Sequence, residues 1–362
     1  MKKIFGSSIL VALIAGASFV FGLAACSNGS DGNAALLAAG GTTQTGEDQQ
    51  QQQQAPAPYK DAGSVTIDGK EYKLVTFGTW PQTVKAEDVD LLESERKNVG
   101  VFTYVKGSDG EWYSRLKEDA HEEGYNYTDG SEVKQKSANS YKWFKVEPIK
   151  WRVLTTDYNG TGRKLLLSVK ILEGRPYAES CYNVRTINGN TVYPNNYEYS
   201  SIRSFFNGAE NSFLQTAFNA VEQEAIAITK VDNGILSTKS DGVSSGENKY
   251  ICNDTYDKIF LLSERESTKK EYGFDYDGIS SITRNLDATD YAKAGGVKCF
   301  AMHVGTTDYY GGCWMLRSPC WNVNNSVDTA QIYIRGCQPG GCGGLSANYS
   351  KDYGVVPALC LK

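Results

Sequence analysis

Two short segments of this 362-residue chain carry residue types found in known catalytic or metal-binding motifs. Residues 242–246 fit G-x-S-x-G, but a nucleophile elbow needs an apolar strand before its serine, and this segment lies among polar residues. His303 is the only histidine downstream that could act as a base. Residues 275–278 resemble the start of a calcium loop, whose twelfth position must be a bidentate glutamate and is here Leu286. Neither segment predicts catalysis or a calcium site.

Cysteines are the other chemically reactive residues. Apart from Cys26, the chain has Cys181, Cys252, Cys299, Cys313, Cys320, Cys337, Cys342 and Cys360. An even number suits disulfide pairing in an oxidising compartment, although the sequence cannot choose the connectivity. Cys337 and Cys342 could close a short local loop. A zinc site would need a better ligand supply than two histidines and no C-x-x-C pair, so we expect no metal and no cofactor.

The region from 314 to 353 has an unusual composition. It combines Trp314, Trp321, Tyr333 and Tyr349 with several asparagines and many glycines. Rigid aromatic rings beside small polar side chains are typical of adaptable binding surfaces. A glycine-rich β core with buried aromatics is the alternative. We expect some of these residues to form a binding face.

The first residues have the parts of an export signal. A basic start, Met1-Lys2-Lys3, precedes an apolar run at 4–23, and Leu23-Ala24-Ala25-Cys26 resembles the lipobox of bacterial lipoproteins. A membrane-spanning helix is the alternative, but glycines and serines interrupt the run and polar residues follow it. We therefore expect residues 1–25 to be removed and Cys26 to be lipidated. The mature protein would be exported and lipid-anchored, at the outer membrane or cell surface.

Residues 26–58 predict a disordered tether. They are mostly Gly, Ala, Ser, Thr and Gln, including a glutamine run at 49–54, and cannot bury enough apolar surface to fold. As a random coil, such a segment would span about 30 Å. The remaining residues, 59–362, are long enough for one large domain. With 42 acidic and 37 basic residues, the chain lacks the basic surface of a nucleic-acid binder, and we expect a monomer that contacts the membrane through its lipid.

Hydrophobic patterning predicts an α+β domain. Alternation around Asp68-Gly69 predicts a hairpin over 65–76, and further strands are expected at 143–154 (broken at Pro148), 164–171 and 257–262. Helices are expected at 200–206, ended by Gly208, at 211–228 after a cap at Asn211 or Ser212, and at 288–294. Beyond residue 295, short strands and glycine turns with much irregular structure are expected.

Five ordered blocks give the chain a family resemblance. They are residues 77–82 (FGTWPQ), 148–154 (PIKWRVL), 200–208 (SSIRSFFNG), 314–319 (WMLRSP) and 354–359 (GVVPAL). Together they resemble a family of exported bacterial domains of unknown function, the DUF6273 type, from about Tyr72 to Leu361.

The last two blocks also resemble the variable lipoproteins of treponemal diversity-generating retroelements. That resemblance implies a C-type-lectin fold of the formylglycine-generating-enzyme type, in which a C-terminal segment, here 319–353, forms a variable ligand-binding face. Adenine-directed mutation can produce Asn, Tyr, Ser, Asp, Gly, Cys, Ile or Arg but not Trp or Gln, so Trp321, Gln331 and Gln338 would be fixed scaffold. The ligand-binding positions implied are Cys320, Trp321, Asn322, Asn324, Asn325, Tyr333, Arg335, Cys337, Asn348 and Tyr349.

The sequence thus predicts a surface-displayed, non-enzymatic lipoprotein that binds a protein or glycan through its C-terminal segment. Two alternatives stay open. One is an enzyme of the formylglycine-generating type that uses a cysteine pair such as Cys337 and Cys342. The other is a structural envelope lipoprotein with no diffusible ligand.

Overall fold

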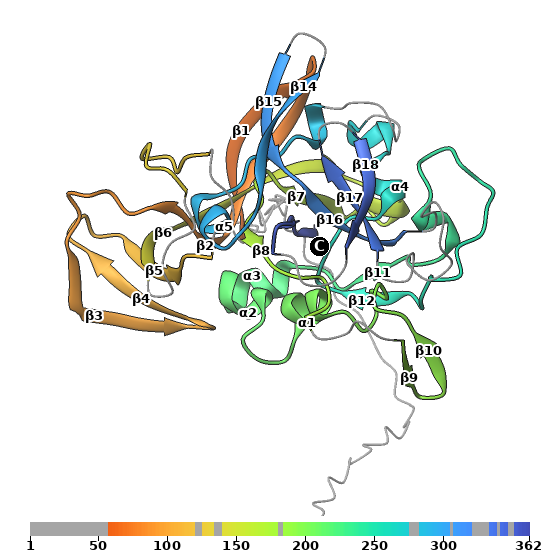
Figure 1. The fold of residues 1–362 in the computed structure, drawn as a ribbon, viewed down its shortest axis with the longest axis horizontal. Helices are drawn as coiled ribbons and strands as arrows, with labels where there is room; N and C mark the ends of the chain where they lie inside the picture. The colour runs from red at the N-terminus through yellow and green to blue at the C-terminus, as the bar shows by residue number, and fades with distance from the viewer. Residues whose placement is uncertain are drawn as a thin grey trace, which may run out of the picture. The chain divides into compact units, whose positions relative to one another are not determined.

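The alternating segment at 65–76 forms the hairpin that the sequence predicts (Figure 1). The computed structural model describes residues 57–119, 125–133, 140–179, 184–274, 282–304, 307–320, 333–338, 341–346 and 351–362. Strand β1 (Lys60–Ile67) pairs antiparallel with β2 (Lys70–Val84). Asp68 and Gly69 connect them with φ values of 49° and 73°. Both lie in the left-handed region, which Asp-Gly adopts readily in a type I′ turn.

The larger sheet among the described residues has nine strands, in the order β13-β20-β7-β6-β5-β4-β3, with β2 paired to β6 and to β1. The strands not yet given are β3 (Leu91–Val99), β4 (Phe102–Gly107), β5 (Trp112–Lys117), β6 (Tyr141–Thr155), β7 (Lys164–Ser168), β13 (Ile259–Phe260) and β20 (Ala358–Leu361). One edge of the 15-residue β6 pairs with β2, and its other edge pairs first with β5 and then with β7. Strand β6 is therefore the centre of this sheet.

The break expected at Pro148 does not occur, because β6 is continuous through it. The pairing of β6 with β5 ends at Lys145, and its pairing with β7 begins at Trp151, so neither strand lies opposite the proline. On the β2 side, Pro148 pairs with Thr79 beside a shift in register. A strand tolerates the missing N–H of proline where the hydrogen-bond ladder is already interrupted.

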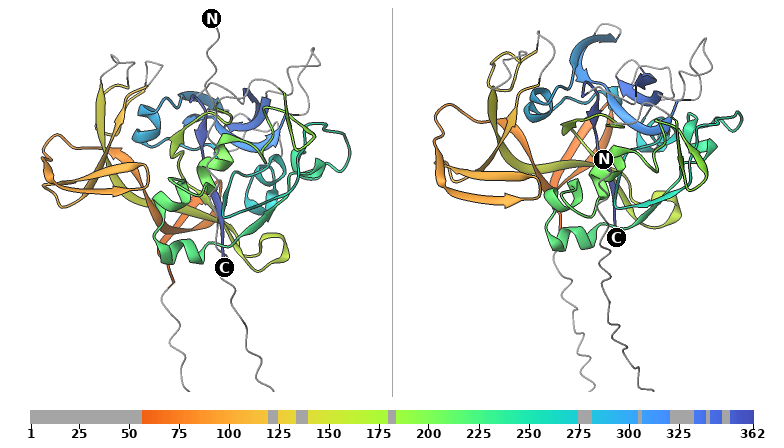
Figure 2. Two further views of the ribbon diagram at one scale, coloured as in Figure 1. Left: turned by 90° about the horizontal axis from the view of Figure 1, so that it is seen from below. Right: turned by 60° about the horizontal axis from the view of Figure 1, so that its bottom comes forward.

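A second sheet of the described residues has five strands in the order β18-β17-β16-β19-β8. They are β8 (Glu173–Gly174), β16 (Trp314–Pro319), β17 (Tyr333–Gln338), β18 (Gly341–Ser346) and β19 (Gly354–Val355). The described residues also form three two-stranded pairs: β9 (Arg185–Ile187) with β10 (Asn190–Val192), β11 (Thr229–Val231) with β12 (Thr255–Asp257), and β14 (Cys299–Val304) with β15 (Thr307–Gly312). In both views of Figure 2, the blue strands β16–β18 lie apart from the orange strands β3–β4.

The helices are short. They are α1 (Ser201–Asn207), α2 (Phe213–Ala217), α3 (Ala220–Ala225), α4 (Glu264–Ser267), α5 (Asp290–Ala294) and the 3₁₀ turns η1 (Tyr158–Gly160), η2 (Ile235–Thr238), η3 (Lys270–Tyr272) and η4 (Ile282–Arg284). The expected helix at 200–206 is α1, with Ser200 as its cap and Gly208 at its end. Gly208 has a φ of −58°, so it ends the helix without a left-handed turn. The described chain is mixed and strand-rich with few helices and much loop, which confirms the α+β class.

The single helix expected at 211–228 is wrong, since the structure has α2 and α3 there. The chain is extended at Phe218, and Asn219 begins α3 by a capping box with Glu222. The Phe218 ring packs against Phe77 at 4.9 Å between centroids, and it is buried. Burial of this ring and the new cap outweigh the weak preference of the segment for one continuous helix. Ser212 caps α2 as expected.

Residues Ala55–Lys362 form one compact unit with an aromatic core. Trp80 and Trp151 are almost fully buried, and the Trp151 indole donates a hydrogen bond of 2.7 Å to the Phe77 carbonyl. Trp80 contacts Phe213 of α2 at 4.7 Å between ring centroids. Packing of these rings holds helix α2 against the nine-stranded sheet. No helix in the described part of the chain is long and apolar enough to cross a membrane.

Candidate functional site

Strand β16 leads directly into the predicted binding segment, and all six of its residues are buried. It pairs antiparallel with β17 at Trp314–Cys337 and again at Pro319–Ile334, with a shift in register between the two pairs. The Arg317 N–H donates to the Leu262 carbonyl at 2.9 Å. The strand is thereby joined to the segment before α4 as well as to its own sheet.

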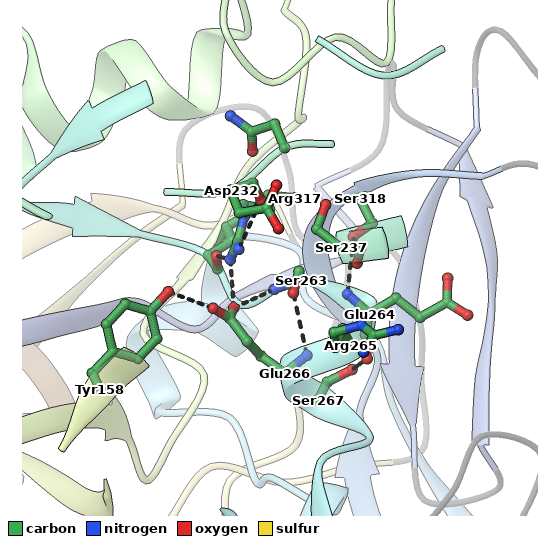
Figure 3. A network of polar contacts seen from close by, with 12 residues as sticks. Tyr158, Asp232, Ser237, Ser263, Glu264, Arg265, Glu266, Ser267, Arg317 and Ser318 are labelled. Carbon is green, nitrogen blue, oxygen red and sulfur yellow. Dashed lines mark hydrogen bonds and ion pairs between the residues drawn. The ribbon is translucent and has the colours of Figure 1, made fainter. Parts of the chain in front are cut away.

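The Arg317 side chain is the centre of a buried polar network under β16 (Figure 3). Its Nη1 donates to Glu266 Oε2 at 2.5 Å and to the Leu261 carbonyl at 2.7 Å. Its Nε and Nη2 donate to the Asp232 carbonyl at 3.3 and 3.1 Å. The guanidinium therefore has one carboxylate and two backbone carbonyls as acceptors, which is the kind of environment a buried arginine needs.

Glu266 is held in place by its own helix terminus. Ser263 caps α4, and the Glu266 carboxylate accepts the Ser263 N–H at 2.8 Å, which completes a capping box. Tyr158 donates to the other carboxylate oxygen at 2.6 Å. Burial acts to raise the pKa of Glu266, but Arg317 and these hydrogen bonds hold it below its ordinary value. Burial acts to lower the pKa of Arg317, but Glu266 holds it above its ordinary value. Both groups are therefore charged at neutral pH.

The last residues of β16 are fixed by side chains from two other segments. Ser318 Oγ accepts the Glu264 N–H at 2.9 Å and donates to the Ser237 carbonyl at 3.1 Å. The buried Asn248 donates from Nδ2 to the Pro319 carbonyl at 3.1 Å. The point at which the chain leaves β16 is thus held by a helix cap, a 3₁₀ turn and a loop asparagine.

The predicted ligand-binding residues fall into three groups. Cys320 and Cys337 are buried, at 1% and 0% exposure, which suits a structural role better than contact with a ligand. Tyr333 and Arg335 occupy alternate positions in the sequence of β17. The others lie outside the described residues, namely Trp321, Asn322, Asn324, Asn325, Asn348 and Tyr349. Cys26 also lies outside them, so its lipidation stays a prediction.

The cysteine pair singled out by its spacing is brought together. Cys337 lies directly opposite Cys342 in the β17–β18 hairpin, which the dipeptide 339–340 connects. Cys252, Cys299 and Cys360 form no disulfide with any described residue. Burial raises the pKa of Cys252 to about 11 and those of Cys299 and Cys360 to about 12. These three thiols are therefore protonated and poorly reactive at neutral pH.

The other candidate motifs do not acquire a catalytic setting. Ser244 is exposed in a loop with no strand before it, so 242–246 is not a nucleophile elbow. No group of three or more His, Cys, Asp or Glu side chains that could hold a metal ion occurs among the described residues. Residues 275–278 lie outside the described part.

Reasoning from the sequence missed the network of Arg317, Glu266 and Tyr158. One local signal was present, because Ser263 and Glu266 have the S-x-x-E spacing of a capping box. That spacing identifies the start of α4. It does not reveal that the same glutamate compensates an arginine far along the chain.

One comparison with known proteins finds a family. The model of a family described as Domain of unknown function (DUF6273) matches residues 161–362. Three of the five blocks that carry the resemblance lie within the match, at 200–208, 314–319 and 354–359, and the other two precede it. No curated protein and no solved structure matches the chain. Because the matched residues cover more than half of the sequence, the chain belongs to the DUF6273 family.

Proposed function

We propose that this protein is a ligand-binding protein without enzymatic activity, whose binding face lies between Pro319 and Gly354. The observation that carries the proposal is the connection between β16 and β17. Pro319 pairs with Ile334, so residues 320–332 join two neighbouring antiparallel strands. Hairpin connections usually have roughly two to five residues, and much longer ones are commonly functional. A connection of this length at the end of a fixed strand is therefore the best candidate for recognition.

The root of this connection supports the proposal. The Arg317–Glu266 pair and the bonds to Ser318 and Pro319 fix the end of β16 from beneath. Binding residues commonly lie on loops that a rigid scaffold positions. The connection itself contains Trp321, three asparagines and small residues, a composition that suits contact with a protein or a glycan.

The finer fold and the location belong to the same proposal. We infer a C-type-lectin-like fold of the formylglycine-generating-enzyme type, supported by the order of the sequence blocks and by a β-rich unit in which the first and last strands share one sheet. We also infer export, lipidation at Cys26 and display of the unit by the tether 26–58, at the outer membrane or cell surface. Labelling of cells with a radioactive fatty acid should mark the wild type and not Cys26→Ser.

A binding assay tests the face directly. The unit 55–362 would be applied to arrays of defined glycans and of extracellular proteins, and each hit would be titrated. Combined replacement of Trp321, Asn322 and Asn324 by Ala should weaken binding at least about tenfold. Tyr256→Ala is the matched control, because Tyr256 is an aromatic residue of β12 with 66% exposure. A ligand that binds both variants equally well would contradict the proposed face.

Diversification of the segment is a separate part of the proposal. If a retroelement rewrites it, clones of one strain should differ at the codons for Tyr333, Arg335, Asn348 and their eligible neighbours, and not at Trp321 or Gln338. A reverse transcriptase gene with a near-copy of the 3′ end nearby should accompany them. Sequence variation spread evenly over 59–362 would contradict this part without affecting the binding assay.

The register of the β17–β18 hairpin favours one second candidate. Cys337 and Cys342 lie opposite each other, and a cysteine-dependent oxidase of the formylglycine-generating type would need such a pair. The complete burial of Cys337 counts against access by a substrate. Binding of copper by the reduced protein, abolished by Cys337→Ser, would favour the enzyme, and the absence of copper binding would exclude it.

A further inference from the structure

A second buried arginine, Arg152 of β6, has an environment opposite to that of Arg317. It is 3% exposed and pairs in register with Leu74 of β2. Its guanidinium lies 4.9 Å from the centroid of the Tyr72 ring and 5.1 Å from that of Phe274. Its Nη2 donates to the Thr283 carbonyl at 3.2 Å.

No carboxylate among the described residues compensates this charge. The described part of the chain gives Arg152 no ion pair, and the titratable groups that face it are Tyr72 and Lys150. Burial lowers the pKa of Arg152 to about 10, and Tyr72 acts in the opposite direction. Removing one partner of a buried ion pair is strongly destabilising because the other charge stays uncompensated. Arg152 is in that uncompensated condition.

Arg152 is one of the residues that line a cavity of about 310 Å³, together with residues of β1, β2 and β6. Lys150 and Asn285 are the other polar residues of its wall, and Val65, Leu74 and Leu286 are among the apolar ones. The Asn285 side-chain oxygen is buried and accepts no hydrogen bond from any described group. The cavity wall therefore combines two cationic side chains, one amide whose oxygen is a free acceptor, and apolar side chains.

We propose that this cavity binds a small organic carboxylate with an apolar body. The carboxylate would pair with Arg152, with Lys150 at the rim. The apolar part would lie against Leu74 and Leu286. The volume is at the lower end of the roughly 300–1,000 Å³ of ligand pockets, which suits a small metabolite.

Two features select this class over others. Inorganic phosphate or sulfate would satisfy Arg152 but would leave the apolar wall exposed to water. A neutral apolar ligand would leave the guanidinium uncompensated. The site uses no residue of the 319–353 segment, so it can be tested independently of the proposed binding face.

The test uses the unit 55–362, titrated by calorimetry with sodium acetate, hexanoate, benzoate and phosphate. We expect hexanoate or benzoate to bind at least tenfold more tightly than acetate or phosphate, and to raise the Tm. Arg152→Met should weaken this binding at least tenfold, whereas the unliganded variant should keep a Tm equal to or above that of the wild type. Arg115→Met is the control, because Arg115 is an exposed arginine stacked on Tyr141.

Three results would overturn the proposal. The first is that none of the four anions binds at millimolar concentration. The second is that phosphate binds as tightly as hexanoate, which would contradict the carboxylate class. The third is that Arg152→Met lowers the Tm and that Asp275→Asn or Asp277→Asn lowers it equally, which would assign Arg152 an internal partner instead of a ligand.

Discussion

Replacement of Arg317 by Met should destabilise the protein by about 3–5 kcal/mol. The variant keeps an apolar stem of similar length but leaves the Glu266 carboxylate buried without its cation. Glu266 would still accept hydrogen bonds from Tyr158 and the Ser263 amide, so its charge would be partly satisfied. The arginine side chain is 1% exposed and the glutamate side chain 10%, so solvent screens the pair weakly. Against a total stability of about 5–15 kcal/mol for a domain, this loss is large.

Urea unfolding of the unit 55–362, followed by tryptophan fluorescence, measures this loss. The double variant Arg317→Met/Glu266→Met removes both charges and should recover most of the stability, because an apolar pair can replace a buried ion pair. The cycle of single and double variants isolates the coupling between the two residues. Arg115→Met, an exposed arginine, should change stability by less than about 0.5 kcal/mol. A loss below about 1 kcal/mol in Arg317→Met, or a double variant no better than the single ones, would refute the reasoning.

The same pair predicts a pH dependence. The pKa of Glu266 is lower in the folded protein than in the unfolded chain. The ionised carboxylate therefore contributes its full share to folding stability above the ordinary glutamate pKa of about 4.3. This contribution is lost as the pH falls through the lower folded value. Arg317, whose pKa is raised, contributes below its ordinary pKa and loses this contribution only in strong alkali. Wild type should therefore lose stability below about pH 4 more steeply than the double variant.

Three further changes test other parts of the structure. Burial raises the pKa of Glu173 to about 7 from 4.5, so the stability of the folded protein falls as the pH rises between these values. In urea unfolding, the free energy of unfolding of Glu173→Gln should exceed that of the wild type by about 1–3 kcal/mol at pH 8 and equal it at pH 4. Gly78→Ala should cost about 2–4 kcal/mol by the same assay, because Gly78 has a φ of 69° and an added Cβ would lie 2.5 Å from the Phe218 ring. Iodoacetamide at pH 8 should modify Cys299 and Cys360 rapidly only after unfolding, as followed by mass spectrometry; fast modification of the native protein would contradict their burial.

Local signals in the sequence predicted local structure well. Asp68-Gly69 forms its turn, the helix expected at 200–206 forms as α1, and Ser212, one of the two expected caps, caps α2. These features depend on a few adjacent residues. The same signals failed where contacts with residues distant in the sequence determine the local backbone structure. Phe218 interrupts a helical pattern to bury its ring. Pro148 is tolerated because neither β5 nor β7 lies opposite it and because its pairing with Thr79 of β2 adjoins a shift in register.

The candidate site was less predictable, for two physical reasons. Eligibility for adenine-directed mutation concerns codons and not burial, so Cys320 and Cys337 met that criterion although they are buried. The partner of Arg317 comes from a helix cap near residue 266, and no periodicity or spacing in the sequence connects the two. Pairing across such a distance is determined by the tertiary fold alone.

The two buried arginines show how structure separates roles that the sequence leaves alike. Each follows an apolar residue in a strand, at Trp151-Arg152 and Leu316-Arg317. Arg317 receives a carboxylate from α4, so its charge strengthens the scaffold under the proposed binding face. Arg152 receives only a carbonyl and two rings, so its charge lowers stability until an anion arrives. A ligand that binds only the folded state adds RT ln(1 + [L]/Kd) to its stability, so the carboxylate proposed for the β6 cavity should stabilise wild type more than any variant that lacks Arg152.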